Sequence, residues 1–439
     1  MTVLQNSVNY GSEKMTCQQA IDYLYSRLKF GSIPGLERIE ALCNKLGDPQ
    51  DKLKFIHVAG TNGKGSTCSM IASMLQKAGY RVGLFTSPYV VDFRERIQIN
   101  GEMIKADELG NIVDDVRPFV EHLDAEGITA TEFEVLTAVA FLYFYRKSCD
   151  YVVLEVGLGG LCDSTNVIKS PELCVITSVS YDHTHILGNT IQEIAYQKAG
   201  IIKENSSVVV YPQVYSEAES IILNTAYDKN CKIYHADKNQ INLNKSNISG
   251  SVFDYKGVSL KTRLVGHHQI LNAAPAYESG LALIDKGVDL SLQDIIYGIE
   301  NAFIAARTQI VSEKPLVVVD GGHNPDGITA LCKNIKTIFS HKKIVAIIGM
   351  MSDKDVSASA EMLAPLCKKI ITVTVDNPRS MSGKELSDIY SKFCTDVTFA
   401  DNIKDIYYDA VSSIQDDEML LVCGSLYLAS EVENIKNQL

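Results

Sequence analysis

The feature that most constrains the fold of this chain is the alternation of short apolar runs with helix-period stretches. The apolar runs are rich in β-branched residues, and the segments between them, such as residues 131–145 and 269–286, carry apolar side chains at helical spacing. Strands that alternate with helices favour a mostly parallel sheet with helices on both faces. The expected strands of the first series are KFIHVAG, RVGLFT, YVVLEVG, LCVITSVS and SVVVY.

A second alternating series begins near Pro315 and contains LVVVDGG, KIVAIIGM, KIITVTV and MLLVCGS. A chain of 439 residues is too long for one ordinary hydrophobic core. We therefore expect two domains, residues 1–304 and 305–439. Residues 232–265 interrupt the first series with polar, Asn- and Lys-rich sequence, which predicts a small β-excursion.

Composition narrows the class of protein. A net charge of −12 argues against a general nucleic-acid or anionic-membrane partner. Eleven cysteines, an odd number without any CxxC pair, favour reduced thiols in a cytoplasmic protein. The first residues lack the basic and apolar regions of a signal peptide, and no apolar run of about 18 residues predicts a membrane span.

The segment HVAGTNGKGST, residues 57–67, has the composition of a phosphate-binding loop. Its glycines let backbone N–H groups approach phosphate oxygens, its lysine supplies a point charge, and its hydroxyl residues open a helix whose dipole favours an anion. The spacing differs from GxxxxGK[ST], and the alternative is a glycine turn with a solvated lysine. The strand before it and the helix after it favour a phosphate loop. The residues concerned are Gly60, Thr61, Asn62, Gly63, Lys64, Gly65, Ser66 and Thr67. The fold class is therefore α/β, with an N-terminal P-loop-type, mostly parallel sheet domain and a smaller C-terminal Rossmann-like domain.

Three residues could hold a divalent cation near this loop. Glu155 ends the run YVVLEVGLGG, and His183 follows another apolar strand, so both are expected at the carboxyl edge of the sheet, where open α/β sheets bind ligands. The Ser66 hydroxyl could join them. The alternatives are a structural carboxylate and a structural histidine, since Mg²⁺ usually prefers oxygen ligands. His185 is a second, less favoured histidine.

Lys198 lies in the last turn of an expected helix. Thr190 and Glu193 form a capping-box pattern at its start, and Gly200 follows its end. From spacing alone, Lys198 would complement the helix dipole.

In the second series, VVDGGHNPDG places Asp320, His323 and Asn324 on the turn leaving a strand, with Pro325 at the first helical position. An aspartate and a histidine at such a turn could grip a ribose or position a phosphate, and the alternative is a capped turn. Arg307, at the expected domain boundary, could reach a phosphate bound to the other domain or could be solvated.

These motifs together resemble the folylpolyglutamate synthase and dihydrofolate synthase family, a branch of the Mur ligase superfamily. The resemblance covers nearly the whole chain in order, and the GKGS ending favours the folate branch. The residues that carry it are HVAGTNGKGST, LFTSPYVVDFRERIQING, LEVGLGGLCDSTNVI, SYDHTHILGNTIQEIAYQKAGIIK, GHHQILNAA, VVDGGHNPDG and LVCGSLYLASEV.

The resemblance implies that ATP lies between the two domains, with Lys64 on its β- and γ-phosphates. It implies two magnesium ions held by residues matching Ser66, Ser87, Glu155 and His183. It also implies that Lys198 is carbamylated, in place of the dipole role above. The further ATP contacts that it implies are Asn272, Arg307, Asp320 and His323.

On the acceptor side, the resemblance implies roles for Pro88 and Arg94, in the loop next to the folate pocket, and for Asp163. The sequence departs from the family pattern at Tyr89, where histidine is usual, and at Leu161, where arginine is common. A third departure is at the hinge, where a WPGR-like sequence is common and this chain reads IAAR, ending in Arg307.

The implied activity is an ATP-dependent ligase that adds L-glutamate to tetrahydrofolate or dihydropteroate through an acyl phosphate, acts as a monomer and releases ADP and phosphate. The alternatives are a Mur-type ligase for another carboxylate, a P-loop kinase or NTPase, and a non-catalytic folate- or nucleotide-binding protein.

Overall fold

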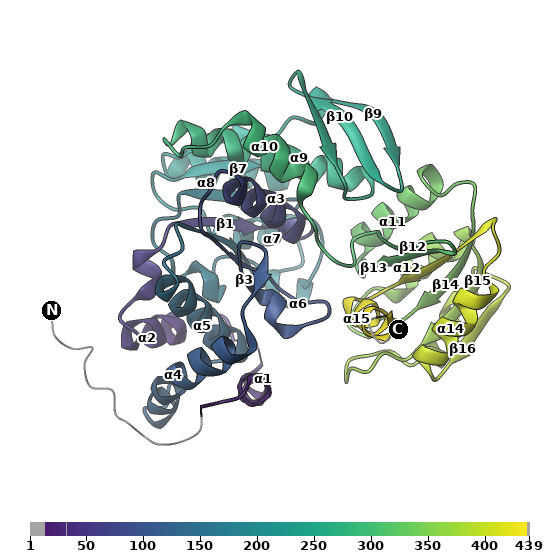
Figure 1. The fold of residues 1–439 in the computed structure, drawn as a ribbon, viewed down its shortest axis with the longest axis horizontal. Coiled ribbons are helices and arrows are strands. Elements are labelled where there is room, and N and C mark those ends of the chain that lie inside the picture. The colour runs from purple at the N-terminus through teal and green to yellow at the C-terminus, as the bar shows by residue number, and fades with distance from the viewer. Residues whose placement is uncertain (1–13, 32, 437–439) are drawn as a thin grey trace.

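The computed structural model describes residues 14–31 and 33–436 and contains two helix-flanked sheets in separate lobes (Figure 1). The N-terminal residues 1–13, on which the expected lack of a signal peptide mainly rests, lie outside this described part. Among the described residues, no helix is both long enough and apolar enough to cross a membrane. The domain boundary at residue 304 stays a prediction.

The larger sheet belongs to the N-terminal lobe. Its strands are β1 (Phe55–Ala59), β2 (Val82–Phe85), β3 (Ile97–Ile99), β4 (Glu102–Met103), β5 (Tyr151–Glu155), β6 (Leu173–Ile176), β7 (Ser207–Val210) and β8 (Lys232–His235). Within the described residues their order is β4-β3-β2-β5-β1-β6-β7-β8. The pairs from β2 to β8 are parallel, and only β3 and β4 add antiparallel pairing at one edge. All five strands expected in this series are present, which confirms the mostly parallel sheet.

The expected β-excursion over residues 232–265 is partly wrong. Residues 232–235 form β8, which pairs in parallel with β7 and extends the larger sheet. Its half-exposed side chains at the sheet edge gave no clear apolar run. Only β9 (Ile241–Asn247), β10 (Gly250–Tyr255) and β11 (Val258–Thr262) form a separate antiparallel sheet. This small sheet projects from the larger lobe beside the second one (Figure 1).

Helices cover both faces of the larger sheet because neighbouring strand residues point in opposite directions. On β1, Phe55 packs into the core under α4 and α5, whereas Ile56 packs into the core under α3, α9 and α10. Helices α7 and α8 close a third core against β6 and β7. The helices of this lobe are α1 (Cys17–Ser26), α2 (Glu37–Lys45), α3 (Lys64–Lys77), α4 (Ala106–Ala125), α5 (Glu132–Arg146), α6 (Thr184–Leu187), α7 (Ile191–Ala199), α8 (Ser216–Asp228), α9 (His267–Asp285) and α10 (Leu292–Asn301).

The second lobe is a smaller α/β unit, as the sequence predicts. Its elements are β12 (Gln309–Glu313), β13 (Leu316–Asp320), α11 (Pro325–Thr337), β14 (Lys343–Ile348), α12 (Val356–Leu363), β15 (Cys367–Val373), α13 (Gly383–Tyr390), β16 (Val397–Ala400), α14 (Ile403–Ser413), β17 (Glu418–Cys423) and α15 (Leu426–Lys436). The strand order is β12-β13-β17-β14-β15-β16 in the described chain. All pairs are parallel except β12 with β13, and the sequence did not predict β12.

Candidate active site

A cavity of about 490 Å³ receives lining residues from both lobes. The larger lobe contributes the turns that follow β1, β2, β5 and β6, and the smaller lobe contributes the turn after β13. Most of the site residues expected from the sequence meet here. Those that line the cavity are Gly60, Thr61, Asn62, Gly63, Lys64, Gly65, Ser66, Ser87, Pro88, Glu155, His183, Lys198, Asn272, Arg307, Asp320 and His323.

Three expected residues are not among those that line the cavity: Thr67, Arg94 and Asp163. Thr67 is buried inside α3, and its backbone N–H donates to the Gly63 carbonyl as part of the helix. Arg94 binds the Asp92 carboxylate with Nε and Nη2. Asp163 is also buried, so neither Arg94 nor Asp163 offers an open group to this cavity.

The phosphate loop depends on glycine at two positions. Gly60 has φ of 154°, and a Cβ there would lie 1.8 Å from Thr177 Oγ1. Gly63 has φ of 85°, and a Cβ there would lie 2.3 Å from Asn272 Oδ1. The Thr177 hydroxyl donates to the Asn62 carbonyl at 2.9 Å, which fixes the loop against the end of β6. The sequence therefore folds into a narrow turn whose backbone remains open to a ligand.

Helix α3 starts at Lys64, so its first N–H groups face the cavity that the loop surrounds. The Lys64 ammonium donates to the Thr61 carbonyl at 3.3 Å, and its charge lowers the pKa of Glu155 against the larger effect of burial, which raises it. This cation, the helix dipole and the free N–H groups all favour an anion at the same place.

The expected metal ligands have the chemistry of a magnesium site. Glu155 is buried, and its Oε2 accepts the Ser87 N–H at 3.2 Å, which places the two residues side by side. Burial lowers the pKa of His183 to about 4, so its imidazole is neutral at pH 7 and able to bind a metal. Ser66 is buried in the first turn of α3.

The described residues contain no cluster of three or more His, Cys, Asp or Glu side chains that could hold a metal. Mg²⁺ is usually bound by one or two carboxylates together with water and substrate phosphates. One carboxylate and two hydroxyl residues beside a phosphate loop fit that pattern, with the histidine as an additional ligand.

Lys198 does not complement the dipole of its own helix. Its side chain is only 3% exposed, and its ammonium donates to the Gly60 carbonyl of the phosphate loop at 2.9 Å. Burial, together with the charge of Lys64, lowers the pKa of Lys198 to about 7. The helix itself forms as expected, with a Thr190–Glu193 capping box and Gly200 directly after its end.

From the smaller lobe, Asp320 organises the turn after β13. Its Oδ2 accepts the N–H and the hydroxyl of Thr308 at 2.8 and 2.7 Å, and its Oδ1 accepts the Gly322 N–H. These bonds hold Thr308 at φ of 47° and thereby fix Arg307 beside the cavity. The Nδ1–H of His323 donates to the Gly321 carbonyl at 2.8 Å, which leaves Nε2 as an acceptor.

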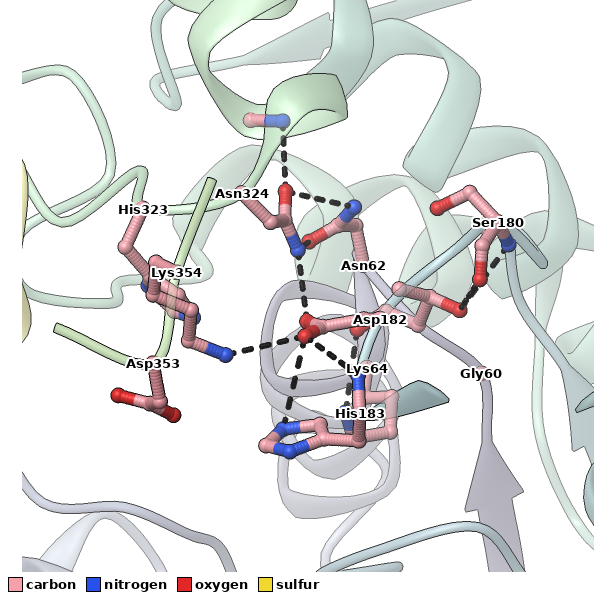
Figure 2. Close-up of polar contacts among 12 residues, drawn as sticks. Gly60, Asn62, Lys64, Ser180, Asp182, His183, His323, Asn324, Asp353 and Lys354 are labelled. Carbon is pink, nitrogen blue, oxygen red and sulfur yellow. Dashed lines mark hydrogen bonds and ion pairs between the residues drawn. The ribbon is translucent and has the colours of Figure 1, made fainter. Parts of the chain in front are cut away.

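A polar bridge between the lobes lies beside the phosphate loop (Figure 2). Asp182, which precedes His183, accepts Lys354 Nζ on Oδ1 at 3.0 Å and Asn324 Nδ2 on Oδ2 at 2.9 Å. Asn324 also donates to Asn62 Oδ1 at 3.3 Å. Burial alone would raise the pKa of Asp182, but His183 in its protonated form and the Lys354 ammonium hold this pKa below its usual range. Since His183 is neutral at pH 7, Lys354 is the cation that matters there.

Asp182 and Lys354 are not among the site residues that the sequence predicts. The position of Asp182, directly before His183 and close to the carboxyl edge of the sheet, could have indicated it. Lys354 lies in a loop after β14 without any motif to mark it.

Tyr89, which stands where the expected pattern has histidine, contacts two neighbouring side chains. Its hydroxyl lies 2.5 Å from the Tyr25 hydroxyl of α1, and the Arg96 guanidinium lies 5.3 Å from the centre of its ring. Pro88, the residue before it, lines the cavity after a cis peptide bond from Ser87. The loop is closed by Glu95, whose carboxylate accepts three backbone N–H groups.

The two lobes match domains of known proteins, and these matches identify the class of enzyme. Residues 58–279 match the Mur ligase middle domain, and residues 306–426 match the Mur ligase glutamate ligase domain. The two lobes, with a phosphate loop in the cavity between them, are thus the architecture of an ATP-dependent carbon–nitrogen ligase.

Full-length relatives narrow the family further. The chain is 37% identical to the dihydrofolate synthase/folylpolyglutamate synthase of Bacillus subtilis (strain 168), over 94% of this chain and 98% of the relative. It is 34% identical to the folylpolyglutamate synthase of Lacticaseibacillus casei, over 95% of this chain and 98% of that relative. The chain belongs to the folylpolyglutamate synthase and dihydrofolate synthase family.

Solved structures agree with this assignment. The folylpolyglutamate synthase of Thermotoga maritima superposes with a TM-score of 0.84 at 34% identity, covering 95% of this chain and 96% of that one. The Escherichia coli FolC structure with DHPP and ADP superposes with a TM-score of 0.84 at 28% identity, covering 96% and 98%. The Mycobacterium tuberculosis folylpolyglutamate synthase with ADP and AMPPCP superposes with a TM-score of 0.86 at 28% identity, covering 95% of this chain and 98% of that one.

Proposed function

We propose that this protein joins L-glutamate to a reduced folate with ATP, and that dihydropteroate is a second acceptor. The observation that carries the proposal is the convergence of Lys64, Glu155 and His183 from one lobe with Arg307 and His323 from the other on a single cavity. Relatives that bear the family names, and a FolC structure holding DHPP and ADP, support the choice of acceptor.

In the proposed reaction, an acceptor carboxylate oxygen attacks the γ-phosphorus of ATP, the bond to the bridging oxygen breaks, and ADP leaves. The glutamate amine then attacks the carbonyl carbon of the acyl phosphate. The tetrahedral intermediate loses phosphate, the nitrogen loses a proton, and an amide remains. The two steps convert a poor leaving group into a good one.

The residues of this chain would bind and orient the reactants. Lys64 and the N-terminus of α3 would hold the β- and γ-phosphates, and Arg307 would neutralise charge from the opposite lobe. Magnesium, held by Ser66, Ser87, Glu155 and His183, would supply charge neutralisation at the phosphates. Enclosure between the lobes would keep water from the acyl phosphate.

We also propose that Lys198 is carbamylated. Its burial and its lowered pKa make the neutral, nucleophilic amine available near pH 7. The carbamate would place a carboxylate-like group beside the phosphate loop. Pro88 would contact the acceptor, whereas Arg94 and Asp163 would act on it through the loops that they hold.

We further propose a cytoplasmic monomer without a nucleic-acid or membrane partner, on its net charge of −12 and its eleven free cysteines. Sedimentation at micromolar concentration with and without ATP tests the monomer.

The test of the activity is ATP turnover with glutamate and either tetrahydrofolate or 7,8-dihydropteroate, with the product identified by mass. A glutamate added to both acceptors supports both activities, and a glutamate on tetrahydrofolate alone restricts the enzyme to polyglutamylation. ATP consumption without any glutamate added to either acceptor contradicts the folate assignment.

A further inference from the structure

The polar bridge between the lobes, defined as Asn62, Asp182, Asn324 and Lys354, joins parts of the chain that are distant in sequence (Figure 2). Asn62 belongs to the phosphate loop, and Asp182 belongs to the segment after β6. Asn324 caps the N-terminus of α11, and Lys354 follows β14. Each lobe thus contributes two residues.

The hydrogen bonds of Asp182 depend on the arrangement of the lobes. Its Oδ1 accepts the His183 N–H at 2.9 Å and Lys354 Nζ at 3.0 Å, and its Oδ2 accepts Asn324 Nδ2 at 2.9 Å. If the lobes separate, the carboxylate loses both partners from the smaller lobe and keeps only its contacts with His183, the backbone N–H at 2.9 Å and imidazole Nε2 at 3.8 Å.

The ion pair at the centre is largely dehydrated. The side chains of Lys354 and Asp182 are 11% and 12% exposed. The cost of removing such charges from water largely offsets their attraction, so the pair adds little net stability. Because Asp182 and Lys354 come from different lobes, the pair forms only in the geometry that brings them within 3.0 Å of each other. This geometry is a relative position of the two lobes.

We propose that Asp182, Asn324 and Lys354 are positioning residues that hold the lobes in the closed arrangement in which glutamate, and not water, reaches the acyl phosphate. This inference rests on the proposed function. Its structural basis is that the bridge ends on Asn62 of the phosphate loop and on the backbone of His183, so lobe position and phosphate site are linked by direct contacts.

The experiment compares Lys354→Met, Asp182→Asn and the double variant by two measurements. The first is the ratio of ADP formed to glutamate incorporated, and the second is the Kd for AMPPCP. Lys368→Met is the matched control, because Lys368 is an exposed lysine that pairs with the buried Glu418 inside the smaller lobe and contacts no residue of the bridge. Lys354→Arg tests whether another cationic side chain at this position keeps the wild-type ratio and the wild-type Kd.

Lys354→Met leaves the Asp182 carboxylate unpaired beside the phosphate loop. We expect the AMPPCP Kd to rise about tenfold, because the unpaired carboxylate repels the nucleotide phosphates in a partly buried site. We expect the ADP-to-glutamate ratio to rise severalfold above one, because water then competes for the acyl phosphate. The double variant should recover nucleotide affinity, since the unpaired charge is gone, but should keep the high ratio, since the bridge is still absent.

Two results overturn the proposal. A ratio that stays at one in both Lys354→Met and the double variant shows that the bridge does not protect the intermediate. A double variant that binds AMPPCP as weakly as Lys354→Met shows that Lys354 contacts the nucleotide directly. If Lys354→Met fails to fold, the ratio of ADP formed to glutamate incorporated is measured in Asp182→Asn. Asparagine has nearly the size of aspartate and keeps one acceptor oxygen.

The proposed function fails separately. Wild-type protein that adds no glutamate to any folate acceptor contradicts the ligase assignment. The bridge is then still judged by AMPPCP affinity and by small-angle scattering. Nucleotide should compact the wild type and Lys368→Met, but not Lys354→Met. Equal compaction of the wild type, Lys368→Met and Lys354→Met contradicts the proposed role of the bridge.

Discussion

Replacement of Lys198 tests whether burial has prepared this lysine for carbamylation. The side chain is 3% exposed, and burial, then the charge of Lys64, lowers its pKa from 10.5 to about 7. At pH 7, roughly half of such an amine is neutral, against roughly one in 3,000 for an ordinary lysine. Only the neutral amine attacks CO₂, so the reactive fraction is raised about a thousandfold. The nitrogen forms a bond to carbon and releases one proton.

The sign of the pH dependence follows from this lowered pKa. Below about pH 7 the charged ammonium dominates, and the neutral fraction falls about tenfold for each pH unit. Above about pH 8 the neutral fraction is nearly complete. At constant dissolved CO₂, carbamylation should therefore rise between pH 5.5 and 8 and then level off, whereas an ordinary lysine would continue to gain above pH 10.

The assay is ¹³C NMR of protein equilibrated with ¹³CO₂, combined with ligase turnover of the same samples. A carbamate carbon should be present in the wild type and absent in Lys198→Ala. Lys203→Ala is the matched control, because Lys203 is partly buried, has a pKa lowered by burial and donates to the Asn166 carbonyl outside the cavity. Turnover of Lys198→Ala should fall at least a hundredfold and recover partly with acetate or propionate, which can occupy the vacated carboxylate position.

A wild-type spectrum without a carbamate at pH 8 under saturating CO₂ would refute this reasoning. So would a carbamate signal that persists in Lys198→Ala. If turnover of Lys198→Ala equals that of the wild type, the lysine serves only to hold the Gly60 carbonyl, and the carbamate has no role.

Three further predictions concern the phosphate loop and its neighbours. Lys64→Ala should raise the ATP Kd about a hundredfold, since a charge-assisted contact is lost, and unchanged affinity in calorimetry would exclude Lys64 from the phosphates. Glu155→Gln should raise the magnesium concentration needed for half-maximal turnover by tenfold or more without lowering Tm, and an unchanged magnesium titration would remove Glu155 from the metal site. Gly63→Ala should destabilise the protein by about 1–2 kcal/mol, because φ is 85° and a Cβ would lie 2.3 Å from Asn272 Oδ1; an unchanged Tm would contradict this conformational argument.

The sequence predicts the central strands well because each is buried on both faces. KFIHVAG and YVVLEVG are apolar runs interrupted only by His57 and Glu155, and β1 and β5 are buried along their full length. The strands that it does not predict, β3, β4, β12 and β16, lie at or next to a sheet edge. β4 has two exposed residues, and β12 is half-exposed and pairs antiparallel with β13, so neither has an apolar run to mark it.

The cavity is predictable for a related reason. Parallel strands end at one edge, so residues after β1, β5 and β6 must lie near one another, and Lys64, Glu155 and His183 do. Lys198 was harder, because its capping pattern is correct and yet its side chain turns to the Gly60 carbonyl. No local pattern reports such a tertiary contact.

The two halves of the site are therefore held by different kinds of interaction. The phosphate half is set by chain geometry, with Gly60 and Gly63 in conformations that leave no room for a Cβ. The opposite half lines the cavity only through the position of the smaller lobe, where the Asp182–Lys354 pair and the Asn324–Asn62 hydrogen bond join the two lobes. Changes in the loop should weaken nucleotide binding whatever the acceptor, whereas changes in the bridge should alter how the acyl phosphate divides between glutamate and water. A variant at the bridge that retains ATP binding but wastes ATP would separate the two contributions.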